Sequence, residues 1–421
     1  MTAWCEIVKF QISTSSGQQN IPILHNPNDV AYCVFKTVAK NTDNVSNTNR
    51  MGIGAMDSNG NGRWMAIRDQ DDITTTSADT MWDTGCIGIM NSSNNSVDFS
   101  ADAVDKSLWI AGNIAISVTN TPSTSWDVFI EIHGGTDYKN VSIGNLTFGG
   151  GDATTPLDVG HDLTGLRMIC PLSNSLAGET ESDAVISEGF FDGTNMACIS
   201  GTCNDNQNSD SETWRSSSTD FVVRELSGGS GSIAGESTVA FQTDGALFTH
   251  SNTYSGDREA LYIVWEGPTC KVITAQTNGT APSDINLNTI GRRPSSLSIL
   301  SIADGDLDPG PNVQHLWFIS GAVDTLGNNF VLGVFSENDE STSDTDRFQS
   351  SDDSYMRTDL TGSVTGRAEW KEWNNGEGAT LEQTDATGAA LVRMFILAII
   401  PLNTKANLTG NFKRTLSGGF Q

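Results

Sequence analysis

The sequence is poor in basic side chains. Its 421 residues carry 23 Lys and Arg against 51 Asp and Glu, which gives a formal net charge of −28. Binding to DNA or RNA needs clustered Lys and Arg that displace counterions from phosphates. We therefore expect no nucleic-acid partner, and we interpret the acidic surface as an aid to solubility.

Long apolar runs and paired cysteines are also missing. The longest apolar run, Met394–Pro401, is far shorter than the roughly 20 residues of a membrane helix, so we expect no membrane insertion. The opening residues lack the basic and apolar regions of a secretory signal. The seven cysteines have no paired spacing, and most lie in apolar runs such as Tyr32–Phe35. These features are typical of a protein with reduced thiols that is made in a cytoplasm.

Turn-forming residues, in contrast, are abundant. There are 42 glycines, and Ser, Thr, Asn and Asp are dense throughout the chain. Runs of four to eight apolar or alternating residues are separated by Asn-Gly, Asp-Gly and Gly-Gly pairs, as in β-proteins. No long window has helical spacing. The sequence therefore predicts an all-β fold of short antiparallel strands.

The same order of features occurs three times along the chain. Opening strands begin at Val8, Val141 and Val272, at intervals of 133 and 131 residues. Compact apolar strands follow at Ala31–Phe35, Leu166–Cys170 and Leu297–Leu300. Each copy closes on a further apolar strand, at Trp126–Ile132, Ala260–Trp265 and Met394–Ile400. Self-similarity at a fixed period indicates a repeat architecture.

We therefore predict three tandem, degenerate, antiparallel β-sandwich or jelly-roll-like units. Their predicted boundaries are 1–139, 140–271 and 272–401, followed by a C-terminal extension at 402–421. The extension carries Lys405, Lys413 and Arg414 in an otherwise acidic chain, so it is either an arm that docks on an acidic neighbour or a solvated tail.

No motif in the sequence indicates a catalytic site. A serine hydrolase would need a Gly-x-Ser-x-Gly elbow between a strand and a helix, and none is found. The histidines are scattered, which favours isolated surface or strand-end positions: His25, His133, His161, His250 and His315. A sandwich glycanase would need paired carboxylates. The strand carboxylates instead fit solvated faces: Glu131, Glu266, Glu369 and Glu372. We expect no enzyme activity.

Two patterns suggest binding sites. Asp57, Asn59 and Asn61 match the first half of a calcium-binding loop, although Arg68 stands where the closing Glu is needed. These residue types are also favoured in plain turns, so calcium and turn chemistry both remain open. Trp370 and Trp373 are three positions apart on a predicted strand and should face opposite sides. One of the two could then be an exposed platform for a sugar or a protein partner, whereas filling of a core or an interface is the favoured role for most tryptophans of the chain.

The chain resembles the repeated β-sandwich proteins of tailed-bacteriophage virions. The resemblance rests on the strand at 31–35, on Met51–Ala55 and on the closing segment Phe129–Gly135. The Gly-Phe-x-Pro segment of that family is only approximated, at Asn26–Asn28 and Arg293–Pro294.

The resemblance implies a structural component of the tail, a fibre or the capsid exterior. Such a protein is assembled in the host cytoplasm, forms homo-oligomers and contacts other virion proteins or a host-surface glycan. The alternative is a carbohydrate-binding, lectin-like β-sandwich protein, with a sandwich glycanase as the weaker third interpretation.

Overall fold

The computed structural model describes residues 2–94, 96–174, 176–204, 211–305, 313–374, 377–386 and 391–402. The prediction of an all-β fold is confirmed: in these ranges every sheet is antiparallel and no α-helix is found. Three short 3-10 turns are present: η1 (Pro27–Asp29), η2 (Lys106–Leu108) and η3 (Asn288–Ile290). Within the described residues no helix is long and apolar enough to cross a membrane. The predicted extension lies outside the described residues beyond Leu402.

The strands form six sheets, three with seven strands and three with four. The first large sheet has the order β1 (Trp4–Gln11), β11 (Asp127–Gly134), β3 (Val30–Thr37), β5 (Asn49–Asp57), β6 (Gly62–Asp69), β7 (Ala78–Thr84) and β15 (Thr180–Ser182). Its small companion has the order β2 (Gly17–Pro22), β10 (Asn113–Asn120), β9 (Val97–Ala103) and β8 (Ile87–Met90).

The second and third pairs of sheets have the same strand order. The second large sheet consists of β12 (Asn140–Phe148), β22 (Arg258–Glu266), β14 (Gly165–Cys170), β16 (Ala184–Phe191), β17 (Met196–Cys203), β18 (Thr213–Ser218) and β26 (Val313–Gln314). Its companion consists of β13 (Thr154–Asp158), β21 (Gly245–Asn252), β20 (Ile233–Gln242) and β19 (Val223–Leu226).

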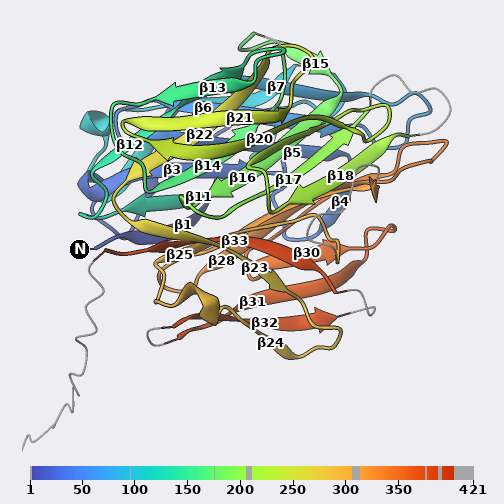
Figure 1. Ribbon diagram of the computed structural model, residues 1–421. Helices are drawn as coiled ribbons and strands as arrows, with labels where there is room; N and C mark the ends of the chain where they lie inside the picture. The colour runs from blue at the N-terminus through green and yellow to red at the C-terminus, as the bar shows by residue number, and fades with distance from the viewer. Residues whose placement is uncertain are drawn as a thin grey trace, which may run out of the picture.

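The third large sheet consists of β23 (Thr269–Gln276), β33 (Arg393–Ile400), β25 (Ser296–Ser301), β27 (Leu316–Val323), β28 (Asn329–Ser336), β29 (Thr345–Ser350) and β4 (Val45–Asn47). Its companion consists of β24 (Ser283–Asn286), β32 (Gly378–Ala386), β31 (Val364–Asn374) and β30 (Tyr355–Thr358). Figure 1 shows β24, β31 and β32 as an outer layer beside β23 and β33.

The last strand of each large sheet comes from a distant part of the chain. Strand β15 pairs with β7, β26 pairs with β18, and β4 pairs with β29. The first large sheet thus receives a strand from the second part of the chain, the second sheet from the third part, and the third sheet from the first part. Each of these additions covers a sheet edge that would otherwise present unpaired backbone groups.

The large sheets are buried on both faces. On β3, Cys33 and Phe35 pack in the core between the first large and small sheets, whereas Tyr32 and Val34 face the opposite way. The opposite faces of all three large sheets meet in one central core. The second sheet contributes residues of β16 to this core, and the third contributes residues of β28. Strands buried on both faces read as continuous apolar runs, and β5 accordingly has no exposed residue.

The two ends of the described chain meet at one side chain. The Asp137 carboxylate accepts hydrogen bonds from the backbone N–H groups of Ala3 (3.0 Å) and Leu402 (2.8 Å). Asp137 belongs to the link, residues 135–139, that joins β11 to β12. The first and last described segments of the chain therefore lie side by side, next to the link between β11 and β12.

Candidate functional site

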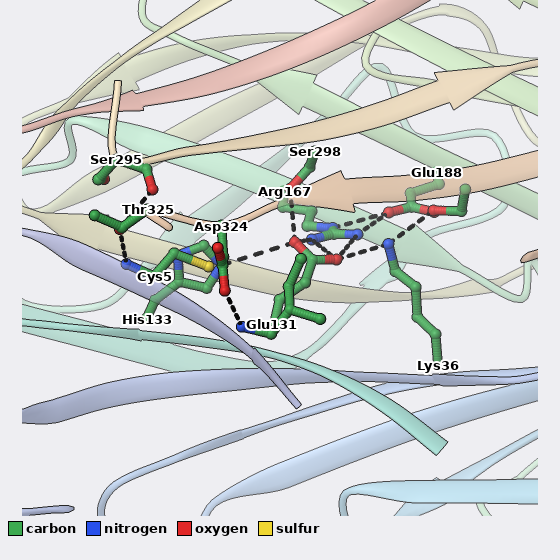
Figure 2. Close-up of polar contacts among 12 residues, drawn as sticks. Cys5, Lys36, Glu131, His133, Arg167, Glu188, Ser295, Ser298, Asp324 and Thr325 are labelled. Carbon is green, nitrogen blue, oxygen red and sulfur yellow. Dashed lines mark hydrogen bonds and ion pairs between the residues drawn. The ribbon is translucent and has the colours of Figure 1, made fainter. Parts of the chain in front are cut away.

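A cluster of charged side chains lies inside the central core. Lys36 projects from β3, Glu131 from β11, Arg167 from β14 and Glu188 from β16, and their side chains are at most 3% exposed. Strand alternation places them there, because their neighbours Phe35, Ile130 and Met168 point into the cores between the sheets. Figure 2 shows the four side chains converging, with Ser298 of β25 beside them.

The cluster connects all three large sheets by direct contacts. The Lys36 Nζ lies 2.7 Å from Glu131 Oε1 and donates to Ser320 Oγ of β27 at 2.8 Å. Arg167 donates from Nε to Glu188 Oε1 at 2.8 Å, and its Nη1 lies 3.3 Å from Glu131 Oε2. Two serines of the third sheet complete the network: Ser298 donates to Glu131 (2.7 Å) and Ser320 donates to Glu188 (3.2 Å).

The cluster is balanced in charge, with two cations and two carboxylates. Burial by itself would raise the pKa of Glu131, but Arg167 and Lys36 outweigh it and hold that pKa well below its usual range. Burial lowers the pKa of His133, whose ring stacks on Tyr32 with centroids 4.5 Å apart. These side chains are sealed from solvent, and the cluster links the three large sheets from inside the core.

The structure corrects two sequence-based expectations here. Glu131 was expected on a solvated face, yet its exposure is 0%; His133 was expected at the surface or at a strand end, and it lies near the end of β11 but with an exposure of only 1%. The reason is that β11 is buried along its whole length. The sequence did contain a signal for this burial: a charged residue stands inside a strand that is apolar at both odd and even positions. The same signal is found at Lys36, Arg167 and Glu188.

The predicted calcium ligands form a tight turn between β5 and β6. The Asp57 carboxylate accepts from the backbone N–H groups of Asn59 (2.8 Å) and Asn61 (2.9 Å) and from the Asn61 side-chain amide (2.8 Å). Asp57 is buried, whereas Asn59 and Asn61 are exposed. In the described residues no group of three or more His, Cys, Asp or Glu is placed to hold a metal ion. The carboxylate is thus used by the turn itself, and calcium binding stays a prediction.

Two other turns repeat this geometry. Asp324, between β27 and β28, accepts from the N–H groups of Leu326 and Asn328 and from the Asn328 amide. Asp192, between β16 and β17, accepts from Thr194 and Asn195 in the same manner. The recurrence of one hydrogen-bond pattern at corresponding places favours turn chemistry as the role of these aspartates.

Asp192 and Asp324 also bond across to the strand that opens the next part of the chain. Asp192 Oδ2 accepts from the N–H of Val272 on β23 at 2.8 Å, and Asp324 Oδ2 accepts from the N–H of Ile7 on β1 at 3.0 Å. Asp57 takes all of its described donors from its own turn. The junction with β12 therefore lacks the aspartate bond that closes the other two junctions.

A cleft of about 350 Å³ lies at this open junction. Its walls are η1, the Asp57 turn, the first residue of η2 and the link 135–139 with the start of β12. A neighbouring cleft of about 380 Å³ lies between the segments 24–28 and 109–112, and Asn28 lines both. Among these positions, only Asp57 and Asn59 were predicted from the sequence as binding residues.

The tryptophan pair does not have the predicted orientation. A β-bulge at Lys371 shifts the register, so that Trp370 pairs with Leu381 and Trp373 pairs with Ala379. Because positions 379 and 381 share one face of β32, the two tryptophans also share a face. Their rings are 5.9 Å apart and pack against the core of the third pair of sheets. The expectation that they face opposite sides is therefore wrong, and sugar binding by them stays untested.

Comparison with known proteins gives no relative from which a function follows. No protein-family model matches the chain, and no curated protein matches it. Among solved structures, an anion-selective porin from Comamonas acidovorans is 9% identical over 94% of this chain and 98% of its own, with a TM-score of 0.10. A score that low carries no argument about fold or function.

Proposed function

We propose that this chain is a structural building block of a tailed-phage virion, made of three degenerate copies of one two-sheet unit that are joined in a ring. The observation that carries the proposal is the cyclic strand exchange, in which β15, β26 and β4 each complete the large sheet of another unit. In this interpretation, the three units are 1–139, 140–271 and 272–401, as the period of the sequence predicts.

The core arrangement supports a load-bearing role. The three large sheets share one apolar core and one buried charge network, so a force on one unit is transmitted to the other two. Strand exchange connects each unit to another by backbone pairing as well as by the chain link. A rigid ring with many surface turns suits the tail, a fibre or the capsid exterior, where contacts with other virion proteins, with further copies or with a host surface are made.

The decisive experiment is the composition of purified phage particles. Particles would be prepared from cells that express the chain, washed at high salt and analysed by quantitative mass spectrometry. We expect the chain in fixed proportion to the other virion proteins. A chain recovered only in the soluble fraction would contradict the proposal.

Native mass measured with and without EDTA adds an independent check. We expect the purified chain to form homo-oligomers whose mass is unchanged by chelation, because the Asp57 carboxylate is occupied by its own turn. Dissociation by EDTA would restore the calcium hypothesis for Asp57, Asn59 and Asn61.

A further inference from the structure

The open junction between β5 and β12 differs in the length of its link from the junction between the second and third parts of the chain. Residues 135–139 join β11 to β12, whereas only residues 267 and 268 join β22 to β23. The longer link loops over the chain end held by Asp137 and forms one wall of the cleft. The open junction is therefore a built feature of this part of the fold.

Four side chains in the cleft are free to bind a ligand. Asn28, Asp29, Asn59 and Lys106 are exposed, and their side chains form no hydrogen bond or ion pair with another described residue. Together they present amide donors and acceptors, a carboxylate and an ammonium group. A cleft of this volume with a few convergent polar groups has the dimensions of a small-molecule site.

The neighbouring cleft adds an apolar surface. Trp109 lines it and is half-buried, with its indole N–H donating to the Val104 carbonyl at 2.9 Å. Leu24 and Ile110 stand beside it with exposures of 76% and 51%. Turn η1 lines both clefts, and η2 places Lys106 in the first cleft and is followed directly by Trp109 in the second. A chain-like ligand crossing both clefts would therefore meet polar groups first and an aromatic surface next.

We propose that these two clefts bind a neutral oligosaccharide. Sugar hydroxyls both donate and accept, which matches the mixed set of Asn28, Asp29, Asn59 and Lys106. The apolar C–H face of a sugar ring matches the indole of Trp109. Neutrality follows from the lack of excess positive charge, because Asp29 and Asp105 both lie near Lys106, and from the net charge of −28, which repels anionic chains at long range.

The inference goes beyond the structural role and does not depend on it. The clefts would bind saccharide whether or not the chain is incorporated into a particle. Absence from purified particles would therefore leave the binding result intact, and a failure to bind sugar would leave the virion proposal intact.

The test is saturation-transfer difference NMR on the full chain with neutral hexasaccharides, namely maltohexaose, cellohexaose, laminarihexaose and chitohexaose. We expect at least one of them to bind with a dissociation constant on the order of 1 mM or tighter. If none binds, the proposal is wrong. Binding of charged oligosaccharides alone would equally overturn it.

A matched pair of variants localises the site. Asn59 occupies the place that Leu326 holds in the Asp324 turn, so the same backbone accepts leucine there. Asn59→Leu should weaken saccharide binding about fivefold, the effect of one lost hydrogen bond, while the fold is kept. Leu326→Asn, at a closed junction, should leave binding unchanged. Lys106→Ala gives a second loss-of-binding test, and full binding in both Asn59→Leu and Lys106→Ala would exclude this cleft.

Discussion

At the scale of residues, the central charges illustrate the difference between a buried and an exposed ion pair. Arg167 serves two carboxylates, those of Glu131 and Glu188, and is almost fully buried. Lys139 pairs with Glu266 at a similar distance, 2.9 Å, but its side chain is 63% exposed. Removing one partner of a buried pair leaves an uncompensated charge in a low-dielectric interior, whereas water replaces the partner of an exposed pair.

We therefore expect Arg167→Met to lower the free energy of unfolding by roughly 3–5 kcal/mol, because both glutamates lose their shared cation. Lys139→Ala is the matched control and should leave stability unchanged. Urea denaturation followed by tryptophan fluorescence measures both. Equal effects of the two variants would show that the central network does not hold the sheets together.

Asp69 gives a prediction with a defined pH dependence. It lies at the end of β6, is buried, and accepts from Ser336 Oγ of β28 at 2.8 Å. Burial outweighs the hydrogen bonds from Ser336 and Cys203 and raises its pKa from 3.8 to about 6. The folded state therefore binds this proton more tightly than the unfolded chain does. The resulting stability is fully present below the unfolded pKa and is lost as pH rises through about 6.

Lowering the pH from about 7 to about 4 should thus stabilise the wild-type chain by roughly 2 kcal/mol relative to Asp69→Asn, which has no proton to gain. Asp220→Asn, which removes an exposed carboxylate, serves as the control for general charge effects. Urea titrations at several pH values give the comparison. Parallel pH profiles for wild type and Asp69→Asn would contradict the assignment.

At the scale of elements, a single bulge decides the role of the tryptophan pair. The inserted Lys371 turns Trp370 and Trp373 to the same side of β31, where Trp370 covers the turn around Gly327. The Trp373 indole N–H donates to the Thr325 carbonyl of that turn at 3.1 Å. Strict alternation would place one of these tryptophans at the surface. Both instead pack against the Asp324 turn, an arrangement that we call the tryptophan clamp.

Gly327 provides the test of this clamp. Its φ is +90°, and a Cβ added there would lie 2.4 Å from the Trp370 ring. Gly291 also has a positive φ, +75°, but has open space around it. Gly327→Ala should cost on the order of 2–4 kcal/mol, and Gly291→Ala only about 1 kcal/mol from the backbone conformation. Thermal unfolding compares the two, and similar losses would mean that Trp370 does not pack tightly on the turn.

Sequence patterns located the opening, apolar and closing strands of each part of the chain but misjudged several side chains. The apolar runs at Ala31–Phe35, Leu166–Cys170 and Leu297–Leu300 lie within β3, β14 and β25. The roles of Glu131 and Trp373 could not be deduced in the same way. One depends on a second layer of packing behind the sheet, and the other on a register shift that no local pattern encodes.

At the scale of the whole molecule, strand exchange and a shared core couple parts of the chain that are far apart in sequence. Thr345 Oγ1 bonds to the N–H of Asn49, and Ser336 Oγ bonds to Asp69, so the first and third large sheets are joined by side chains as well as by β4. Such coupling is expected to remove independent unfolding of each pair of sheets.

We expect a single unfolding transition for the full chain in scanning calorimetry, with equal van't Hoff and calorimetric enthalpies. The fragment 269–402, which lacks β4 and exposes its share of the central core, should fail to fold by itself. Two or three separated transitions, or a fragment with sharp native-like NMR signals, would contradict the coupling and favour independent units.

The sequence by itself determined the all-β class and the position of the strands that open and close each part of the chain, because alternation and turn chemistry act over a few neighbouring residues. The tertiary structure alone decided which charges are buried, which junction stays open and which sheet receives each exchanged strand. Those outcomes depend on contacts between residues separated by a hundred positions or more, such as Lys36 with Ser320 and Glu131 with Ser298. Patterns among neighbouring residues do not identify partners that are so far apart in the sequence.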